Sequence, residues 1–357
     1  MKQKLLFLTA LLLIISVFSG CSSKVVKGGS ISNNLTQTKV VLSELPEDVA
    51  EFSEFFKIAK PVFYTPGLFE GFIPQGLCYS LEKEIVIISG YYPKGEHPSA
   101  LAVIDNTTGE LIKSVGLIGT NGEAYFGHAG GVACSENTIF ITSGGNAYYI
   151  SLSALNNAEN NSDIRFEGSF KLLTAGSFAN CENGVLWTGD FVEDKKSEKE
   201  KAKHITTLPN GETLYAWCEG YKLIKGMPDE GRKNEEGGFV PDCILSIPLQ
   251  VQGMTRLTDG RFVFSTSYGR KNNSKILVYE DIFLKEPNET KSIGSFSVPM
   301  FCFSNGTLDK EYNAVPMSEG IDNVDGKCFV VFESGANKYR NGGGKYPIDY
   351  VLELDIP

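Results

Sequence analysis

Three ionisable side chains lie in glycine-containing segments that could hold a small substrate. His128, one of only three histidines, stands in Tyr125–Gly131, where the neighbouring glycines allow close approach of the backbone. Glu319 directly precedes a glycine, and Arg270 follows one. Together they could perform acid–base chemistry, with Glu319 as general base or metal ligand, His128 as general acid or orienting group, and Arg270 as the partner of an anionic substrate group. An isolated histidine is also common as a hydrogen-bonded structural residue, so these roles depend on the elements that bring the side chains together.

One sequence pattern recurs along the chain and would supply those elements. A glycine-containing pair opens each copy, followed by an apolar strand, a polar turn, a second apolar strand and a Ser or Thr near another glycine. The copies begin near residues 75, 130, 176, 252 and 319. Third strands follow three copies, and a fourth, amphipathic strand is expected at 111–117, 165–172 and 292–298. Repeated four-stranded units are typical of the blades of a β-propeller.

The repeat therefore predicts an all-β fold, a β-propeller of five four-stranded blades. Six blades are the alternative, because the interval between 176 and 252 is long. A β-sandwich is a further alternative, although it does not require one repeated four-stranded unit. The last copy ends after its third strand, so we expect an N-terminal strand at Lys57–Tyr64 to close the ring. Helical spacing of the apolar residues in Glu47–Phe56 predicts a short helix before that strand.

Propeller topology would place the polar ends of these strands together. The innermost strand runs along the axis and the second runs back, so the start of the first and the end of the second meet at one end of the channel. The predicted ligand-binding residues at this end are Gln75, Tyr91, Ser177, Asp190, Gln252 and Tyr268, beside the catalytic candidates His128, Glu319 and Arg270. The recurring glycines could instead serve only to let the backbones crowd the axis.

The first twenty residues are typical of a bacterial export signal. Two lysines precede the apolar run Leu5–Phe18, which is too short to span a bilayer as a helix. The segment Phe18–Cys21 resembles the lipobox of bacterial lipoproteins, which implies cleavage before Cys21 and attachment of acyl chains such as palmitate to it. We expect a signal peptide over 1–20, a lipidated cysteine and flexible tether over 21–45, and the propeller domain over 46–357. The expected location is the extracytoplasmic face of a bacterial cell membrane, with Cys21 as the lipid anchor.

The composition narrows the range of partners. The 33 Lys and Arg residues against 43 Asp and Glu residues give a net charge of −10, and the acidic excess is spread along the chain. This charge disfavours nucleic acid. We expect a monomer with a small-molecule, glycan or peptide ligand at the top face of the propeller. Seven cysteines besides Cys21 lie mostly in apolar runs, which favours buried thiols and leaves one or two disulfides open.

Three blade-opening segments, Phe72–Leu77, Val251–Met254 and Ser318–Ile321, resemble those of small bacterial propellers. They are similar to segments of the plant-type glutaminyl-peptide cyclotransferases and, more distantly, of gluconolactonase-like and streptogramin-lyase-like propellers. The segment Phe264–Arg270 resembles uncharacterised secreted proteins of Gram-positive bacteria. The gluconolactonase-like resemblance implies one divalent cation, such as calcium, on the axis. Glu319 is the metal ligand that this resemblance implies here.

Two functions are consistent with these features. The first is a binding and recognition module of the cell envelope, with tyrosines on its top face in contact with an envelope or extracellular ligand. The second is a propeller enzyme, a lyase, lactonase or glutaminyl cyclotransferase-like protein with a metal-dependent site at the channel mouth. The first is favoured because one carboxylate with two glutamines is a poor hydrolytic site. Convergence of His128, Glu319 and Gln252 within hydrogen-bond reach of a shared ion or ordered water would reverse that preference.

Overall fold

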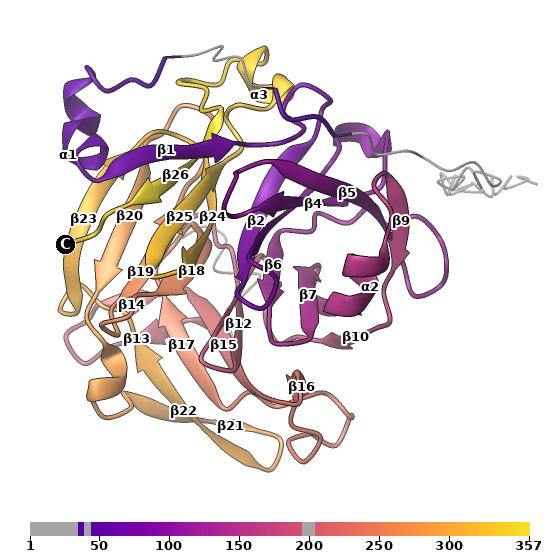
Figure 1. Cartoon of the computed structure of the whole chain (residues 1–357). Coiled ribbons are helices and arrows are strands. Elements are labelled where there is room, and N and C mark those ends of the chain that lie inside the picture. The colour runs from indigo at the N-terminus through magenta and orange to yellow at the C-terminus, as the bar shows by residue number, and fades with distance from the viewer. Residues whose placement is uncertain (1–34, 39–43, 195–203) are drawn as a thin grey trace, which may run out of the picture. The chain divides into compact units, whose positions relative to one another are not determined.

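The computed structural model describes residues 35–38, 44–194 and 204–357. Its regular structure is almost entirely β, and in these ranges five sheets surround one axis (Figure 1). Their innermost strands are β2 (Ile73–Ser80), β6 (Gly131–Cys134), β11 (Phe178–Glu182), β18 (Val251–Arg256) and β24 (Ser318–Val324). Each contacts the next in this order and β24 contacts β2, so the inner strands form a closed ring. The protein is therefore a β-propeller, as predicted, and the β-sandwich alternative is wrong.

The first sheet contains the four strands predicted for it, and the second contains a third strand that was not predicted. In the first, the strands outside β2 are β3 (Ile85–Tyr91), β4 (Ala100–Asp105), β5 (Leu111–Ile118) and β9 (Ser162–Arg165), which pairs parallel to β5. In the second, the strands outside β6 are β7 (Thr138–Ser143), β8 (Asn146–Ser151) and β10 (Gly168–Lys171). Helix α2 (Leu152–Asn157) follows β8, and the Ser151 hydroxyl accepts the Ala154 N–H at its start.

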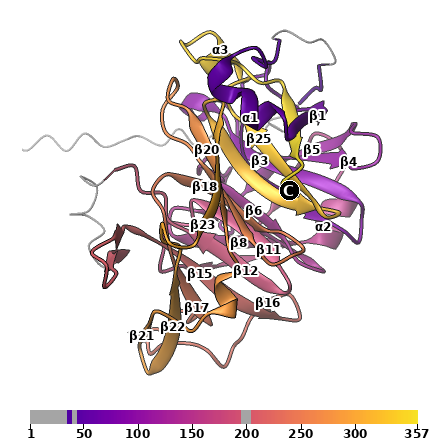
Figure 2. The ribbon, with the colours of Figure 1, turned by 90° about the vertical axis from the view of Figure 1, so that its left-hand side faces the viewer.

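The third sheet is the widest and takes up the long interval after residue 176. Its strands outside β11 are β12 (Val185–Gly189), β15 (Ala216–Ile224), β17 (Cys243–Ile247), β22 (Phe296–Cys302) and β21 (Glu289–Ile293), while β16 (Met227–Pro228) pairs with β15. A separate short hairpin consists of β13 (Thr206–Thr207) and β14 (Thr213–Leu214). Figure 2 shows the β21–β22 hairpin beside β17. The prediction that 292–298 forms the outer strand of the fourth sheet is wrong, because this segment belongs to the third sheet. A later strand forms the outer edge of the fourth sheet.

The fourth and fifth sheets complete the ring. Outside β18 lie β19 (Phe262–Thr266), β20 (Ser274–Tyr279) and β23 (Leu308–Ala314); outside β24 lie β25 (Lys327–Phe332), β26 (Tyr350–Leu354) and β1 (Ala59–Tyr64). Strand β1 pairs antiparallel with β26, with Ala59 opposite Leu354, which confirms that an N-terminal strand closes the ring. The pairing shifts between Pro61 and Phe63, which accommodates a proline on an edge strand.

Short helices lie around the strands. They are η1 (Ala50–Phe52), α1 (Ser53–Phe56), η2 (Pro93–Gly95), η5 (Ile282–Leu284) and α3 (Asn337–Arg340). The first two form the helical segment expected before β1, and Phe52 and Phe55 are fully buried against the fourth and fifth sheets. In the part of the chain that the structure describes, no helix has the length and apolar character needed to cross a bilayer. The expected signal peptide and Cys21 lie outside the described residues, and the other seven cysteines are free thiols.

The recurring glycines occupy the points where neighbouring inner strands touch. A Cβ atom on Gly76 would lie 2.6 Å from the Val132 nitrogen of the next inner strand. One on Gly320 would lie 2.5 Å from the Leu77 nitrogen, and Gly131 and Gly253 make similar backbone contacts. Since real Cβ atoms do not approach backbone so closely, the repeat requires glycine for steric reasons. The crowding expected at the axis is therefore present.

Candidate functional site

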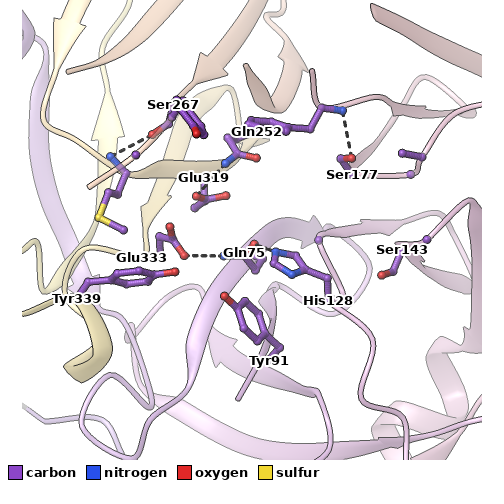
Figure 3. A pocket seen from close by; sticks show the side chains of 18 of the residues that line it. Gln75, Tyr91, His128, Ser143, Ser177, Gln252, Ser267, Glu319, Glu333 and Tyr339 are labelled. Atoms are coloured by element: carbon purple, nitrogen blue, oxygen red, sulfur yellow. Dashed lines mark hydrogen bonds between the residues drawn. The ribbon is translucent and has the colours of Figure 1, made fainter. Parts of the chain in front are cut away.

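A cavity of about 510 Å³ opens at the end of the axis where the inner strands begin (Figure 3). All five sheets contribute to it, because the start of each inner strand and the end of each second strand point to this end. Eight of the nine predicted ligand-binding and catalytic residues line it: Gln75, Tyr91, His128, Ser177, Gln252, Tyr268, Arg270 and Glu319. The topology therefore brings together side chains that are almost 250 residues apart in the sequence. We call this space the upper cavity.

Two carboxyl groups meet at the floor of the upper cavity. Glu319 lies at the start of β24 and is 3% exposed, and Glu333 follows the end of β25. Both carboxyls line the cavity, and the charge of Glu333 affects the ionisation of Glu319. Burial, followed by the charge of Glu333, raises the pKa of Glu319 well above its usual range. Burial also raises the pKa of Glu333 to about 7. Neighbouring buried carboxyls do not both ionise readily, so this pair favours a protonated carboxyl, a proton donor, beside an ionised carboxyl, a proton acceptor.

Two glutamine amides hold this carboxyl pair in place. Gln75 Nε2 donates to Glu333 Oε2 at 3.1 Å and to the Pro74 carbonyl at 2.8 Å. Gln252 Nε2 donates to Glu319 Oε1 at 3.1 Å. Each carboxyl group therefore receives one amide N–H, which fixes its orientation without adding a second charge.

The imidazole of His128 continues this network. Its Nε2 lies 2.5 Å from Gln75 Oε1. Both N–H groups of Gln75 already have acceptors, and Oε1 can only accept, so we assign the proton of a neutral imidazole to Nε2 and the lone pair to Nδ1. The ring stacks on Tyr91, with centroids 4.4 Å apart. Burial, followed by the charge of Lys338, lowers the pKa of His128. The imidazole is therefore neutral at pH 7, with a free proton acceptor.

Arg270 and several aromatic rings form the rim of the upper cavity, and Lys338 contacts two of these rings. The Lys338 ammonium lies 3.2 Å from the hydroxyls of both Tyr91 and Tyr339. The Arg270 guanidinium lies 5.2 Å from the centre of the Tyr339 ring and donates to the Gly342 carbonyl at 2.6 Å. Tyr268 is 39% exposed beside them. This rim suits a ligand with an anionic or carbonyl group and an apolar face.

Asp190 is the predicted ligand-binding residue that the structure does not bring to the upper cavity. It is buried, and its Oδ2 lies 2.5 Å from Nδ1 of His204, whose ring stacks on Trp217. Its Oδ1 accepts the backbone N–H of Ala175 at 2.8 Å. Since Ala175 lines the cavity, this hydrogen bond to Asp190 positions the backbone of a lining residue. Partners inside the protein therefore satisfy this carboxyl, while the next residue, Phe191, lines the cavity.

Two residues of this region, Glu333 in the cavity and Lys338 beside it, were not among the predicted site residues. Glu333 stands where the repeat places polar residues, at the end of a second strand, so the signal for it was present. Lys338 lies in α3, within the long connection between β25 and β26, and no other copy of the repeat predicts that helix.

The resemblance to metal-binding propellers can be tested against the donors present. Within residues 35–38, 44–194 and 204–357, no three His, Cys, Asp or Glu side chains lie close enough to hold a metal ion. The acidic groups lining the upper cavity are Glu319 and Glu333, and both already accept amide hydrogen bonds. Calcium binding at Glu319 therefore stays a prediction.

Comparisons with known proteins identify structural similarity alone. No protein-family model matches the sequence. No curated protein matches it. A glutaminyl cyclase from Myxococcus xanthus is similar over 84% of this chain and 97% of its own, with 11% identity and a TM-score of 0.43. A PQQ-bound aldose sugar dehydrogenase from Streptomyces coelicolor is similar over 83% of this chain and 96% of its own, with 13% identity and a TM-score of 0.43. The assignment of the fold rests on the strand pairing described above.

Proposed function

We propose that the protein is an enzyme that uses the Glu319–Glu333 pair for general acid–base catalysis on a small polar substrate. The observation that carries this proposal is the pair itself, two buried carboxyls with raised pKa values that line one cavity. A carboxyl poised near the working pH transfers protons most effectively in both directions. His128 and Gln252 belong to the same hydrogen-bonded network, which supports the enzyme over the binding module.

The reaction class that this geometry supports best is acyl transfer within one substrate. In such a reaction an amine or hydroxyl of the substrate attacks a carbonyl carbon, and an amine or hydroxyl leaves from the same carbon. The ionised carboxyl of the pair would take the proton from the attacking group, and the protonated carboxyl would give its proton to the leaving group. The two proton transfers occur close together, as the contact between Glu319 and Glu333 requires. Arg270 would hold an anionic or carbonyl group at the rim.

Turnover of two model substrates tests this proposal. We expect the full chain to release ammonia from an N-terminal glutaminyl peptide, or an alcohol from the corresponding γ-ester, with ring closure in both because the amine of the substrate attacks the side-chain carbonyl. Glu319→Gln and Glu333→Gln should each lower kcat/KM by about 100-fold or more, since each removes one partner of the proton transfer. Glu311→Gln, on the exposed strand β23, is the matched control and should retain full activity.

Other outcomes of this assay would contradict the proposal. Binding of a ligand without turnover would favour the recognition module, for which the exposed aromatic rim is the supporting observation. Activity lost in a chelator and restored by calcium would make Glu319 a metal ligand in place of a proton carrier.

We also propose that Cys21 anchors the protein to the outer face of a bacterial cell membrane. The lipobox-like segment before Cys21 supports this proposal. Cells grown with labelled palmitate should incorporate label into the wild-type chain and into none of a Cys21→Ala variant, which should leave the membrane fraction. Equal labelling of both forms would contradict the anchor.

A further inference from the structure

Two aromatic residues line the upper cavity without taking part in its carboxyl and amide network. Phe191 lies shortly after β12 and Tyr268 shortly after β19, and their ring centroids are 6.4 Å apart at an interplanar angle of 41°. Tyr268 is 39% exposed and Phe191 is half-buried, so neither is enclosed in the core. The proposed proton transfers use neither ring. We call this pair the aromatic wall.

Hydrogen bonds of the main chain hold the aromatic wall in place. The N–H of Phe191 donates to the Ser177 hydroxyl at 3.1 Å. The carbonyl of the next residue, Val192, accepts a further backbone N–H at 2.9 Å. On the other side, the side-chain amide of Asn272 donates to the Tyr268 carbonyl at 2.8 Å. Both rings therefore extend from a fixed backbone, so a ligand that packs against them pays little for ordering the wall.

Arg270 supplies a positive charge beside the aromatic wall. Within the described ranges its guanidinium contacts the Gly342 carbonyl and the Tyr339 ring and forms no ion pair with a carboxylate. A guanidinium carries several N–H donors and binds a carboxylate through parallel hydrogen bonds. Arg270 therefore retains donors for an anionic group of a ligand, close to Tyr268 along the chain.

We propose that the upper cavity is selective for glutaminyl dipeptides whose second residue is aromatic and carries the terminal carboxylate. This inference rests on the proposed function, under which the glutaminyl side chain reacts at the Glu319–Glu333 pair. The aromatic wall would contact the ring of the second residue, and Arg270 would bind its carboxylate. The volume of about 510 Å³ suits such a ligand, since small-molecule sites usually span about 300–1,000 Å³.

Steady-state kinetics on three substrates test this inference. They are glutaminyl-phenylalanine, glutaminyl-alanine and glutaminyl-phenylalanine amide. We expect kcat/KM of the wild type to be about tenfold higher for glutaminyl-phenylalanine than for either of the others. Alanine loses the contact with the aromatic wall, and the amide loses the charge that pairs with Arg270.

Substitutions separate the two contacts. Tyr268→Leu removes one ring and should reduce the preference for phenylalanine over alanine to about threefold or less, mainly through KM, whereas Tyr268→Phe keeps the ring and should retain the preference. Arg270→Gln should abolish the preference for the acid over the amide and leave the preference for phenylalanine unchanged. Phe126→Leu is the matched control, because Phe126 is 51% exposed and is not among the described residues that line the upper cavity.

The outcomes distinguish this inference from the proposed function. Turnover of glutaminyl-phenylalanine and glutaminyl-alanine with equal kcat/KM would overturn the inference alone, as would an undiminished preference in Tyr268→Leu. Absence of turnover of all three substrates would overturn the proposed function and this inference with it. Because Tyr268 is exposed, its variants should keep the wild-type melting temperature, which separates a loss of preference from a loss of fold.

Discussion

Replacing Gly320 by alanine should lower the free energy of unfolding by about 3 kcal/mol, the upper end of the usual cost of overpacking. The added Cβ would lie 2.5 Å from the Leu77 nitrogen and 2.7 Å from the Gln75 carbonyl oxygen. Both atoms belong to the backbone of the neighbouring inner strand, so no side chain can move aside to relieve the contact. The ring could accept the methyl group only by separating β24 from β2. Urea-induced unfolding followed by tryptophan fluorescence measures this loss.

Gly306→Ala is the matched control for this substitution. At Gly306 the nearest atom to an added Cβ is the Ser304 hydroxyl oxygen, 3.6 Å away, which is an ordinary van der Waals distance. This variant should unfold at the same urea concentration as the wild type. Equal stability of Gly320→Ala and Gly306→Ala would show that the inner strands are not in close backbone contact.

Replacing Glu319 by glutamine should change how stability depends on pH. A carboxyl whose pKa is raised on folding stabilises the protein fully below its unfolded pKa, and this contribution is lost as the pH rises through the folded pKa. Burial, followed by the charge of Glu333, raises the pKa of Glu319 well above the ordinary value of 4.5, so the folded protein loses stability relative to the unfolded chain as the pH rises above that value. Glu319→Gln removes this titration, so the stability of the variant relative to wild type should rise as the pH increases from about 5 to 8.

Subtracting the unfolding free energy of wild type from that of Glu319→Gln isolates the contribution of the carboxyl pair. Burial also raises the pKa of Asp322, to about 7, but this contribution is present in both proteins and cancels in the difference. Unfolding free energies at several pH values, obtained from urea titrations, give the measurement. Glu311→Gln, on the exposed strand β23, should follow the wild type at every pH. A constant difference between Glu319→Gln and wild type across this range would show that the pKa of Glu319 is not raised.

Most of the propeller could be predicted because its physical requirement recurs in every sheet. Each inner strand must approach its neighbour closely, which demands glycine at Gly76, Gly131, Gly253 and Gly320. Each second strand must be apolar because both of its faces are covered. The same topology maps recurring polar positions onto one end of the axis, so eight of the nine predicted site residues line the upper cavity.

The β21–β22 hairpin was misplaced because strand patterns do not specify which sheet a strand joins. Its alternating residues are compatible with the edge of either the third or the fourth sheet. Only the parallel pairing of Ile244 with Met300 decides between them, and that contact joins residues far apart in the sequence.

The sequence by itself determined the ring, the closing strand and the end of the axis where polar side chains gather, because these features follow from local periodicity and glycine. The tertiary structure decided which of those side chains touch. Glu319 and Glu333 lie in one cavity because the antiparallel pairing of β24 and β25 brings the start of one strand beside the end of the other. Asp190 instead contacts His204. Its side chain, just after the end of β12, points into the core and not into the cavity. Such directions are set by packing between distant segments, which no local pattern records.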